Sequence, residues 1–234
     1  MRVLAIMCHP DDMELDCGGT LLKFKAEGHH VTVCHAANGN MGHYSIMPDE
    51  LREIRREEAK KASAVAGFEI VTADIGDLTI NSASEEQLKK IIKVIRSAKP
   101  DVIITHNPAD YCSDHNELSK LVFKASFDAT CPHFMPELGE AVALTPIFYA
   151  DAEDGIGSKP TEYVDITDYI DIKEKMLSCH ESQLVWLKEH DGIDVVANLR
   201  TEAAFRGNQC GVKYAEAFTQ QLSSGRIRTY RILP

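Results

Sequence analysis

The sequence is short of basic residues, of paired cysteines and of long apolar runs. Its 234 residues include 25 Lys and Arg against 36 Asp and Glu, a formal net charge of −11. Because nucleic acids and anionic membranes attract clustered cationic side chains, this balance argues against both as partners and favours a small-molecule substrate. No run approaches the roughly 20 apolar residues of a membrane span, and no signal-peptide pattern precedes the first apolar run. We therefore expect a soluble cytoplasmic protein.

The seven cysteines are scattered along the chain and include no Cys-x-x-Cys pair. An odd and dispersed set indicates neither a disulfide framework nor a thiolate zinc knuckle. The hydrophobic content of 44% is nevertheless ample for a buried core. The chain is therefore expected to fold without covalent cross-links.

Strand-like and helix-like segments alternate through the first half of the chain. Apolar runs predict strands over residues 2–8, 31–36, 69–73, 102–105 and 146–150. Helical periodicity and capping signals predict helices over residues 14–27, 49–66, 84–98, 115–127, 172–187 and 201–220. This order predicts an α/β, Rossmann-like fold, a mostly parallel sheet with helices on both faces. No repeat or linker interrupts the pattern, so we expect a single domain over residues 1–234.

Polar side chains able to bind a metal follow the first predicted strand directly, in the tetrapeptide His9-Pro10-Asp11-Asp12. The imidazole and the carboxylate three residues apart can converge on one cation, which leaves Asp11 free to move protons. Alternatively, Pro10 turns the chain and the acids stabilise the N-terminus of the next helix. Taken alone, the segment leaves both interpretations open.

A second polar loop follows the strand at residues 102–105 and runs from His106 to His115. Because the carboxyl ends of parallel strands meet at one edge of the sheet, we expect both loops to face the same crevice. The loop at residues 37–42 follows another strand, and its glycines allow a ligand to approach the backbone closely. We place Asn38 of that loop among the substrate-binding candidates.

At this point the chain resembles the PIG-L/LmbE-like zinc-dependent deacetylases, which act mainly on N-acetylglucosaminyl and related amino-sugar conjugates. The matching stretches span nearly the whole chain: residues 9–20, Arg55-x-x-Glu58, Asp114-His115, Lys175, residues 180–183 and residues 214–218. The resemblance implies a zinc ion held by His9, Asp12 and His115, and Asp11 as the general base. It also places Asp114 beside His115 or behind the metal ligands. The same ligands accept other divalent transition metals.

The chain departs from its relatives three residues before the last zinc ligand. Many relatives carry a histidine there that is thought to stabilise the tetrahedral oxyanion, whereas this chain has Cys112. A thiol is a weak hydrogen-bond donor. The oxyanion role can pass to Tyr111, His106 or His180, or the metal alone can serve, and the sequence leaves these alternatives open.

Arg55 also has two interpretations. The resemblance implies that it reaches sugar hydroxyls, but the alternating charges of residues 52–58 equally suit ion pairs on a solvated helix face. Together with Asn38, His106 and Cys112 it completes the predicted substrate-binding set.

We therefore predict a zinc-dependent hydrolase that releases acetate from an N-acetylglucosamine-type conjugate. The alternatives are a catalytically weak or inactive relative, or a sugar- or nucleotide-binding module. A nucleotide-binding module is disfavoured because residues 9–12 replace the Gly-x-Gly-x-x-Gly turn with two acids. The resemblance also implies a homo-oligomer, a trimer or a hexamer.

Overall fold

A single sheet organises the protein. The structure, a computed structural model, describes residues 1–152 and 155–234, and within them seven strands pair in the order β3-β2-β1-β4-β5-β7-β6. The parallel strands are β1 (Arg2–Met7), β2 (His30–Ala37), β3 (Glu69–Ile75), β4 (Val102–Thr105) and β5 (Ile147–Ala150). The antiparallel part consists of β7 (Ala215–Gln220) paired with β5 and with β6 (Glu162–Asp165). This confirms the predicted α/β fold with a mostly parallel sheet.

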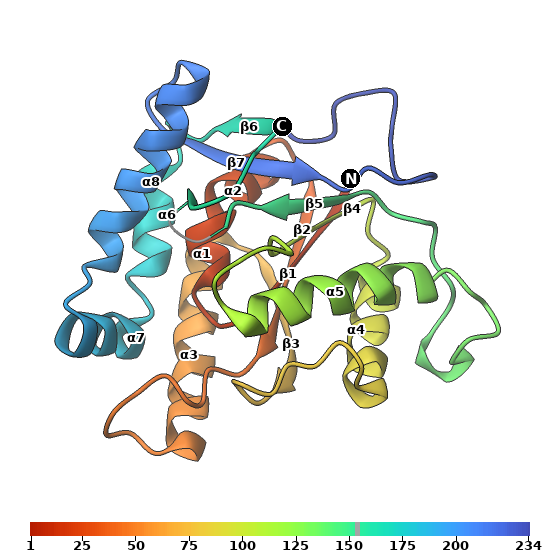
Figure 1. Cartoon of the computed structure of the whole chain (residues 1–234), viewed down its shortest axis with the longest axis horizontal. Helices are drawn as coiled ribbons and strands as arrows, with labels where there is room; N and C mark the ends of the chain where they lie inside the picture. Colours follow the sequence, from red (N-terminus) through yellow and green to blue (C-terminus); the bar gives the residue numbers. More distant parts are fainter. Residues whose placement is uncertain (153–154) are drawn as a thin grey trace.

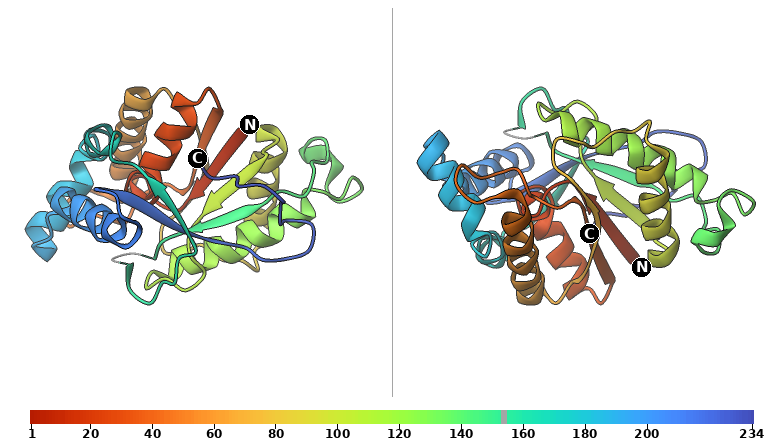
Figure 2. Two further views of the ribbon diagram at one scale, coloured as in Figure 1. Left: turned by 90° about the horizontal axis from the view of Figure 1, so that it is seen from above. Right: turned by 90° about the horizontal axis from the view of Figure 1, so that it is seen from below.

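Two helical layers cover the sheet (Figures 1 and 2). One face packs against α1 (Asp12–Asp16), α2 (Gly18–Ala26), α3 (Pro48–Ala66), α6 (Ile170–Leu177) and α8 (Val195–Cys210). The other packs against α4 (Glu85–Ala98) and α5 (Ser113–Asp128). Side chains of β1 alternate between the two layers, with Val3 and Ala5 in the first and Leu4 and Ile6 in the second. The other helical segments given for residues 1–152 and 155–234 are short: η1 (Pro136–Leu138), α7 (Glu181–Trp186) and the π-helical turn η3 (Leu187–Asp191).

Local sequence signals account for the ends of the best-predicted helices. The Ser84 side chain accepts a hydrogen bond from the backbone N–H of Gln87 and so caps α4. Helix α3 ends at Gly67, whose φ of 68° is a left-handed conformation that glycine adopts without strain. The stripe of Leu88, Ile91, Ile92 and Ile95 faces the sheet and is buried.

Three predicted helices need correction. The segment at 201–220 is not one helix, because α8 ends at Cys210 and residues 215–220 form β7. The segment at 14–27 divides into α1 and α2 at Cys17, whose φ of −146° is not helical. The segment at 172–187 divides into α6 and α7 on either side of residues 178–180. Strand β6 was not predicted at all.

The carboxyl ends of β1 and β4 define the place where a site is expected. Strand β1 pairs with β2 on one side and with β4 on the other, so the strand order changes direction at β1. Such a switch point opens a crevice outside the carboxyl ends of the strands. Among the described residues, no helix is long and apolar enough to cross a membrane.

Candidate metal centre and catalytic site

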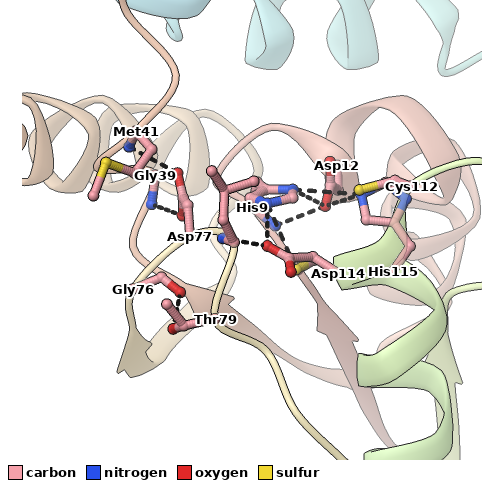
Figure 3. A network of polar contacts seen from close by, with 12 residues as sticks. His9, Asp12, Gly39, Met41, Gly76, Asp77, Thr79, Cys112, Asp114 and His115 are labelled. Carbon is pink, nitrogen blue, oxygen red and sulfur yellow. Dashed lines mark hydrogen bonds and ion pairs between the residues drawn. The ribbon is translucent and has the colours of Figure 1, made fainter.

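The loops after β1 and β4 bring three potential metal ligands into contact. Asp12 Oδ2 lies 3.4 Å from His9 Nδ1 and 3.3 Å from His115 Nε2. The third side of the triangle, from His9 Nδ1 to His115 Nε2, is 3.4 Å (Figure 3). The two loops that the sequence placed at one edge of the sheet therefore meet.

The spacing of these three atoms fits a metal ion better than a set of direct hydrogen bonds. Protein hydrogen bonds of this type have donor–acceptor distances of about 2.7–3.2 Å, and all three separations are longer. An ion about 2.0–2.1 Å from each ligand in tetrahedral geometry sets its ligands about 3.3–3.4 Å apart. His9, Asp12 and His115 thus form a candidate site for a divalent metal, and a tetrahedral ion there keeps one position open.

His106 offers a competing ligand. Its Nε2 lies 3.2 Å from Asp12 Oδ2, and Asp12, His106 and His115 also have metal-ligand spacing. However, this Nε2 already accepts a hydrogen bond of 2.8 Å from the backbone N–H of Cys8. The ring is fully buried and stacks on His115, with ring centroids 3.8 Å apart. His106 therefore lies behind the metal candidates, where it supports His115.

Two acids face the outer nitrogens of the candidate ligands. Asp114 Oδ2 lies 3.5 Å from His9 Nε2 and also accepts a 2.7 Å hydrogen bond from the backbone of Leu78. Asp110 Oδ1 lies 3.3 Å from His115 Nδ1. Carboxylates in such positions orient metal-binding imidazoles. Asp114 thus accompanies His9 rather than His115, and Asp110, which faces His115, was missed by the sequence analysis.

The cluster attracts positive charge. Burial raises the pKa of Asp12, but His115 and His9 outweigh it and hold the pKa well below its usual range. Burial lowers the pKa of His115, but Asp12 and Asp110 outweigh burial and raise the pKa well above its usual value. Without a metal, protons bound to the imidazoles supply the positive charge that Asp12 favours. Metal binding must therefore displace protons from the imidazoles.

Asp11 lies in different surroundings from its neighbour Asp12. Its side chain is buried, and Oδ1 accepts a hydrogen bond of 2.8 Å from Arg55 Nη2. Burial is the largest influence on this carboxyl and raises its pKa to about 6, although Arg55 lowers it. Its backbone φ of 122° is left-handed, which is uncommon for a residue other than glycine and often marks a functional site.

Arg55 is among the largest of the fully buried side chains that the structure describes, with 2% exposure. It contacts Asp11 and also donates a hydrogen bond to the carbonyl of Pro10. The interpretation of Arg55 as part of a solvated ion-pair face is therefore wrong. One turn further along α3, the Glu58 carboxylate accepts hydrogen bonds from the backbone N–H (2.8 Å) and hydroxyl (2.7 Å) of Ser182. The Arg55-x-x-Glu58 motif thus links α3 both to the loop after β1 and to the start of α7.

His180 lies just before α7 and is fully buried. Its Nε2 is 3.3 Å from Oε1 of Glu14, another fully buried residue. Burial lowers the pKa of His180, but Glu14 and Asp11 outweigh this and raise it above its usual value. The sequence analysis missed Glu14, although it follows Asp12 by two residues in a matching stretch.

The other predicted site residues lie at the edge of this cluster or outside it. Cys112 precedes α5 and is half-buried. Burial is the largest influence and raises its pKa, but the hydrogen bonds and charge of His115, together with His9, outweigh it and leave the pKa below its usual value. Tyr111 is 80% exposed. Asn38 donates a hydrogen bond of 3.0 Å to Asp74 and lines a separate cavity of about 410 Å³ between α3 and strands β2 and β3. Pro10 of the loop after β1 lines that cavity, but none of the candidate metal ligands does.

Known proteins resemble this chain in sequence and in fold. The family model described as PIG-L, GlcNAc-PI de-N-acetylase, matches residues 4–126. The diacetylchitobiose deacetylase of Thermococcus kodakarensis is 30% identical over 226 residues, covering 92% of this chain and 81% of that protein. The 4-oxalmesaconate hydratase of Pseudomonas putida is 25% identical over 191 residues, covering 77% of this chain and 73% of that protein. The solved N,N'-diacetylchitobiose deacetylase from Pyrococcus horikoshii gives a TM-score of 0.78 at 27% identity, covering 94% of this chain and 83% of that one.

Proposed function

The chain belongs to the PIG-L family, and on that premise we propose that it is a zinc-dependent hydrolase acting on an N-acetylglucosamine-type conjugate. It cleaves the acetamide with one water, which yields acetate and a free amine. The observation that carries the proposal is the triangle of His9, Asp12 and His115, with sides of 3.3–3.4 Å. An inactive relative would have no need to keep three ligands at metal spacing.

The proposed ligands are His9 Nδ1, Asp12 Oδ2 and His115 Nε2. Zinc held by these residues would lower the pKa of a water molecule and would polarise the acetyl carbonyl. Asp114 and Asp110 fix the two imidazole rings from behind, and His106 supports His115 by stacking on it. These contacts hold the ligand atoms in place before the substrate arrives.

Asp11 is the proposed general base. It takes a proton from the attacking water and returns it to the departing amine, so it must exist in both protonation states during the cycle. A pKa raised to about 6 by burial suits that exchange better than the ordinary value of an exposed aspartate. Arg55 holds the carboxylate in place and limits the rise in its pKa. We assign Arg55 this positioning role rather than a contact to sugar hydroxyls.

Of the candidates for oxyanion stabilisation, we favour His180. Glu14 and Asp11 raise the pKa of His180 and so favour its cationic form, which places His180 and Asp11 in one electrostatic network. Tyr111 is a weaker candidate because its side chain is 80% exposed, whereas such stabilisation acts best where water is excluded. His106 has its Nε2 engaged with the backbone of Cys8.

Acetate release tests the proposed function. The zinc-loaded protein should release acetate and amine in equal amounts from methyl N-acetyl-β-glucosaminide. Dialysis against a chelator should abolish the release, and added zinc should restore it. Retained zinc without turnover on any acetylated amino sugar would favour the inactive relative. An unchanged rate after complete metal removal would rule out the zinc-dependent mechanism.

A further inference from the structure

The two most exposed large apolar side chains in the described part of the chain are Tyr111, with 80% exposure, and Leu78, with 77%. Both lie on loops at the carboxyl edge of the parallel strands. Leu78 follows β3, and Tyr111 follows β4. Exposed apolar surface of this kind gains free energy when a partner covers it.

Contacts of the neighbouring residues place both loops beside the metal cluster, with Leu78 near His9 and Tyr111 near His115. The backbone N–H of Leu78 donates a hydrogen bond of 2.7 Å to Asp114 Oδ2, which lies 3.5 Å from His9 Nε2. The His9 side chain is 19% exposed, more than those of Asp12 (11%) and His115 (6%), so the cluster opens on the His9 side. Tyr111 directly precedes Cys112, whose thiol contacts His115 (Figure 3).

The loop that carries Leu78 is held firmly on both sides. The Asp77 carboxylate accepts hydrogen bonds from the backbone N–H of Gly39 (2.8 Å) and of Met41 (3.0 Å). On the other side, the Thr79 hydroxyl donates a 2.6 Å hydrogen bond to the carbonyl of Gly76. Leu78 itself has a left-handed φ of 62°, a conformation that costs energy for a leucine. Its exposure is therefore a fixed feature of the loop, and backbone outliers of this kind cluster at ligand clamps.

We propose that Leu78 and Tyr111 form an apolar mouth that binds an apolar or aromatic group attached to the amino sugar. The inference rests on the proposed function, since the acetamide must reach the metal cluster for the attached group to lie at its opening. A leucine side chain and a tyrosine ring face together offer dispersion and stacking contacts to a flat ring. Leu78 and Tyr111 are then specificity-determining residues that select conjugates over the bare sugar.

Two glycosides that differ only in the attached group test the proposal. The zinc-loaded protein should release acetate from phenyl N-acetyl-β-glucosaminide with a kcat/KM about tenfold higher than from the methyl glycoside, a difference of ~1.4 kcal/mol. The substitution Leu78→Asn should reduce this ratio to below about threefold. Asparagine tolerates the left-handed backbone and keeps the N–H that Asp114 accepts, so the cluster is left in place.

Leu222→Asn is the matched control. Leu222 is 71% exposed and follows β7, whose last residue pairs with Phe148 near the amino end of β5. It therefore lies at the sheet edge opposite the metal cluster. This variant should keep the full ratio of the parent.

A binding measurement separates this inference from the proposed function. Calorimetry of both glycosides on the zinc-loaded Asp11→Asn protein should give the same preference in Kd. If the parent protein releases no acetate from either glycoside, the proposed function fails, and the Kd ratio still decides the present inference. Two results would overturn the apolar mouth. One is a phenyl-to-methyl ratio near one in the parent protein, and the other is a preference for the phenyl glycoside that survives Leu78→Asn. A fall in solution mass on Leu78→Asn would also overturn it, because the pair would then be an interface between copies of the chain.

Discussion

The two sides of the site surround two adjacent carboxylates in opposite ways. On one side, Asp12 Oδ2 has an imidazole nitrogen of His106, His115 and His9 at 3.2, 3.3 and 3.4 Å, and its pKa is held well below the usual range. On the other side, Asp11 has the single guanidinium of Arg55, and burial raises its pKa to about 6. Neighbouring residues of the same type thus acquire opposite acid strengths from their surroundings.

The backbone at residues 10–12 makes this difference possible. Pro10 follows the end of β1, and Asp11 has a left-handed φ of 122° before α1 begins at Asp12. This turn directs the two carboxylates into different environments, Asp12 into the cluster of imidazoles and Asp11 toward α3. A permanently ionised acid suits metal binding, whereas an acid with a pKa near neutrality suits proton transfer. The division of labour is therefore set by one turn of the chain.

The largest loss of activity is expected when a metal ligand is replaced. Asp12→Asn removes the negative charge that the imidazoles share, so metal affinity should fall by about 100-fold or more, and acetate release should become undetectable. Metal analysis after dialysis, alongside the activity assay, checks both outcomes. One equivalent of tightly bound zinc in the variant would show that Asp12 is not a ligand.

Substitution of the proposed general base should reduce catalysis without reducing metal binding. Asp11→Asn keeps the shape of the side chain but cannot accept a proton, so kcat should fall by about 10²–10⁴ while KM changes little. The variant should retain zinc in the amount found in the parent, because Asp11 is not in the donor triangle. Loss of zinc from both variants would mean that the two carboxylates do not have separate roles.

Arg55 provides a finer adjustment of the base side. A general base must be ionised, so the rate should fall as pH drops through the pKa of Asp11, at or below about 6 in the zinc-loaded parent because a bound cation favours the carboxylate. Arg55 lowers this pKa, so Arg55→Gln should move the acid limb of the pH–rate profile to higher pH. At a pH well below both pKa values, the rate should then fall by about tenfold for every pH unit that the limb moves.

Two further variants control this experiment. Arg55→Lys keeps the charge and should move the limb less than Arg55→Gln. Arg52→Gln, in which the lost guanidinium pairs with Asp74 at the surface, should leave the limb where it is in the parent. A profile of Arg55→Gln that overlays the parent would show that Arg55 does not set the acidity of the base.

Much of the fold followed from the sequence, because parallel strands buried on both faces read as continuous apolar runs. The choice of His9, Asp12 and His115 as metal ligands came instead from the family resemblance. The strand ends then placed His9 and His115 at one edge. Strand β7 did not follow, since its Ala- and Glu-containing segment favours a helix locally and becomes a strand only by pairing with β5 and β6.

Finer features of the site depend on how helices are rotated, which the sequence does not record. Asp110 and Asp114 lie in one short stretch, and only the start of α5 decides that the former faces His115 and the latter His9. Arg55 lies among charged residues of α3, and only the packing of that helix shows that it points inward.

The smallest effect is expected at the residue that distinguishes this chain from many relatives. The Cys112 thiol is half-buried beside His115, on the metal-binding side, and a thiol donates hydrogen bonds weakly. If His180 stabilises the oxyanion, Cys112→Ala should lower kcat by less than about tenfold, whereas His180→Ala should lower it by about 10²–10³. Steady-state kinetics of the two variants decide between them. A larger loss at Cys112 would move oxyanion stabilisation to the metal-binding side, and the separation between the two carboxylates would no longer describe how the site divides its work.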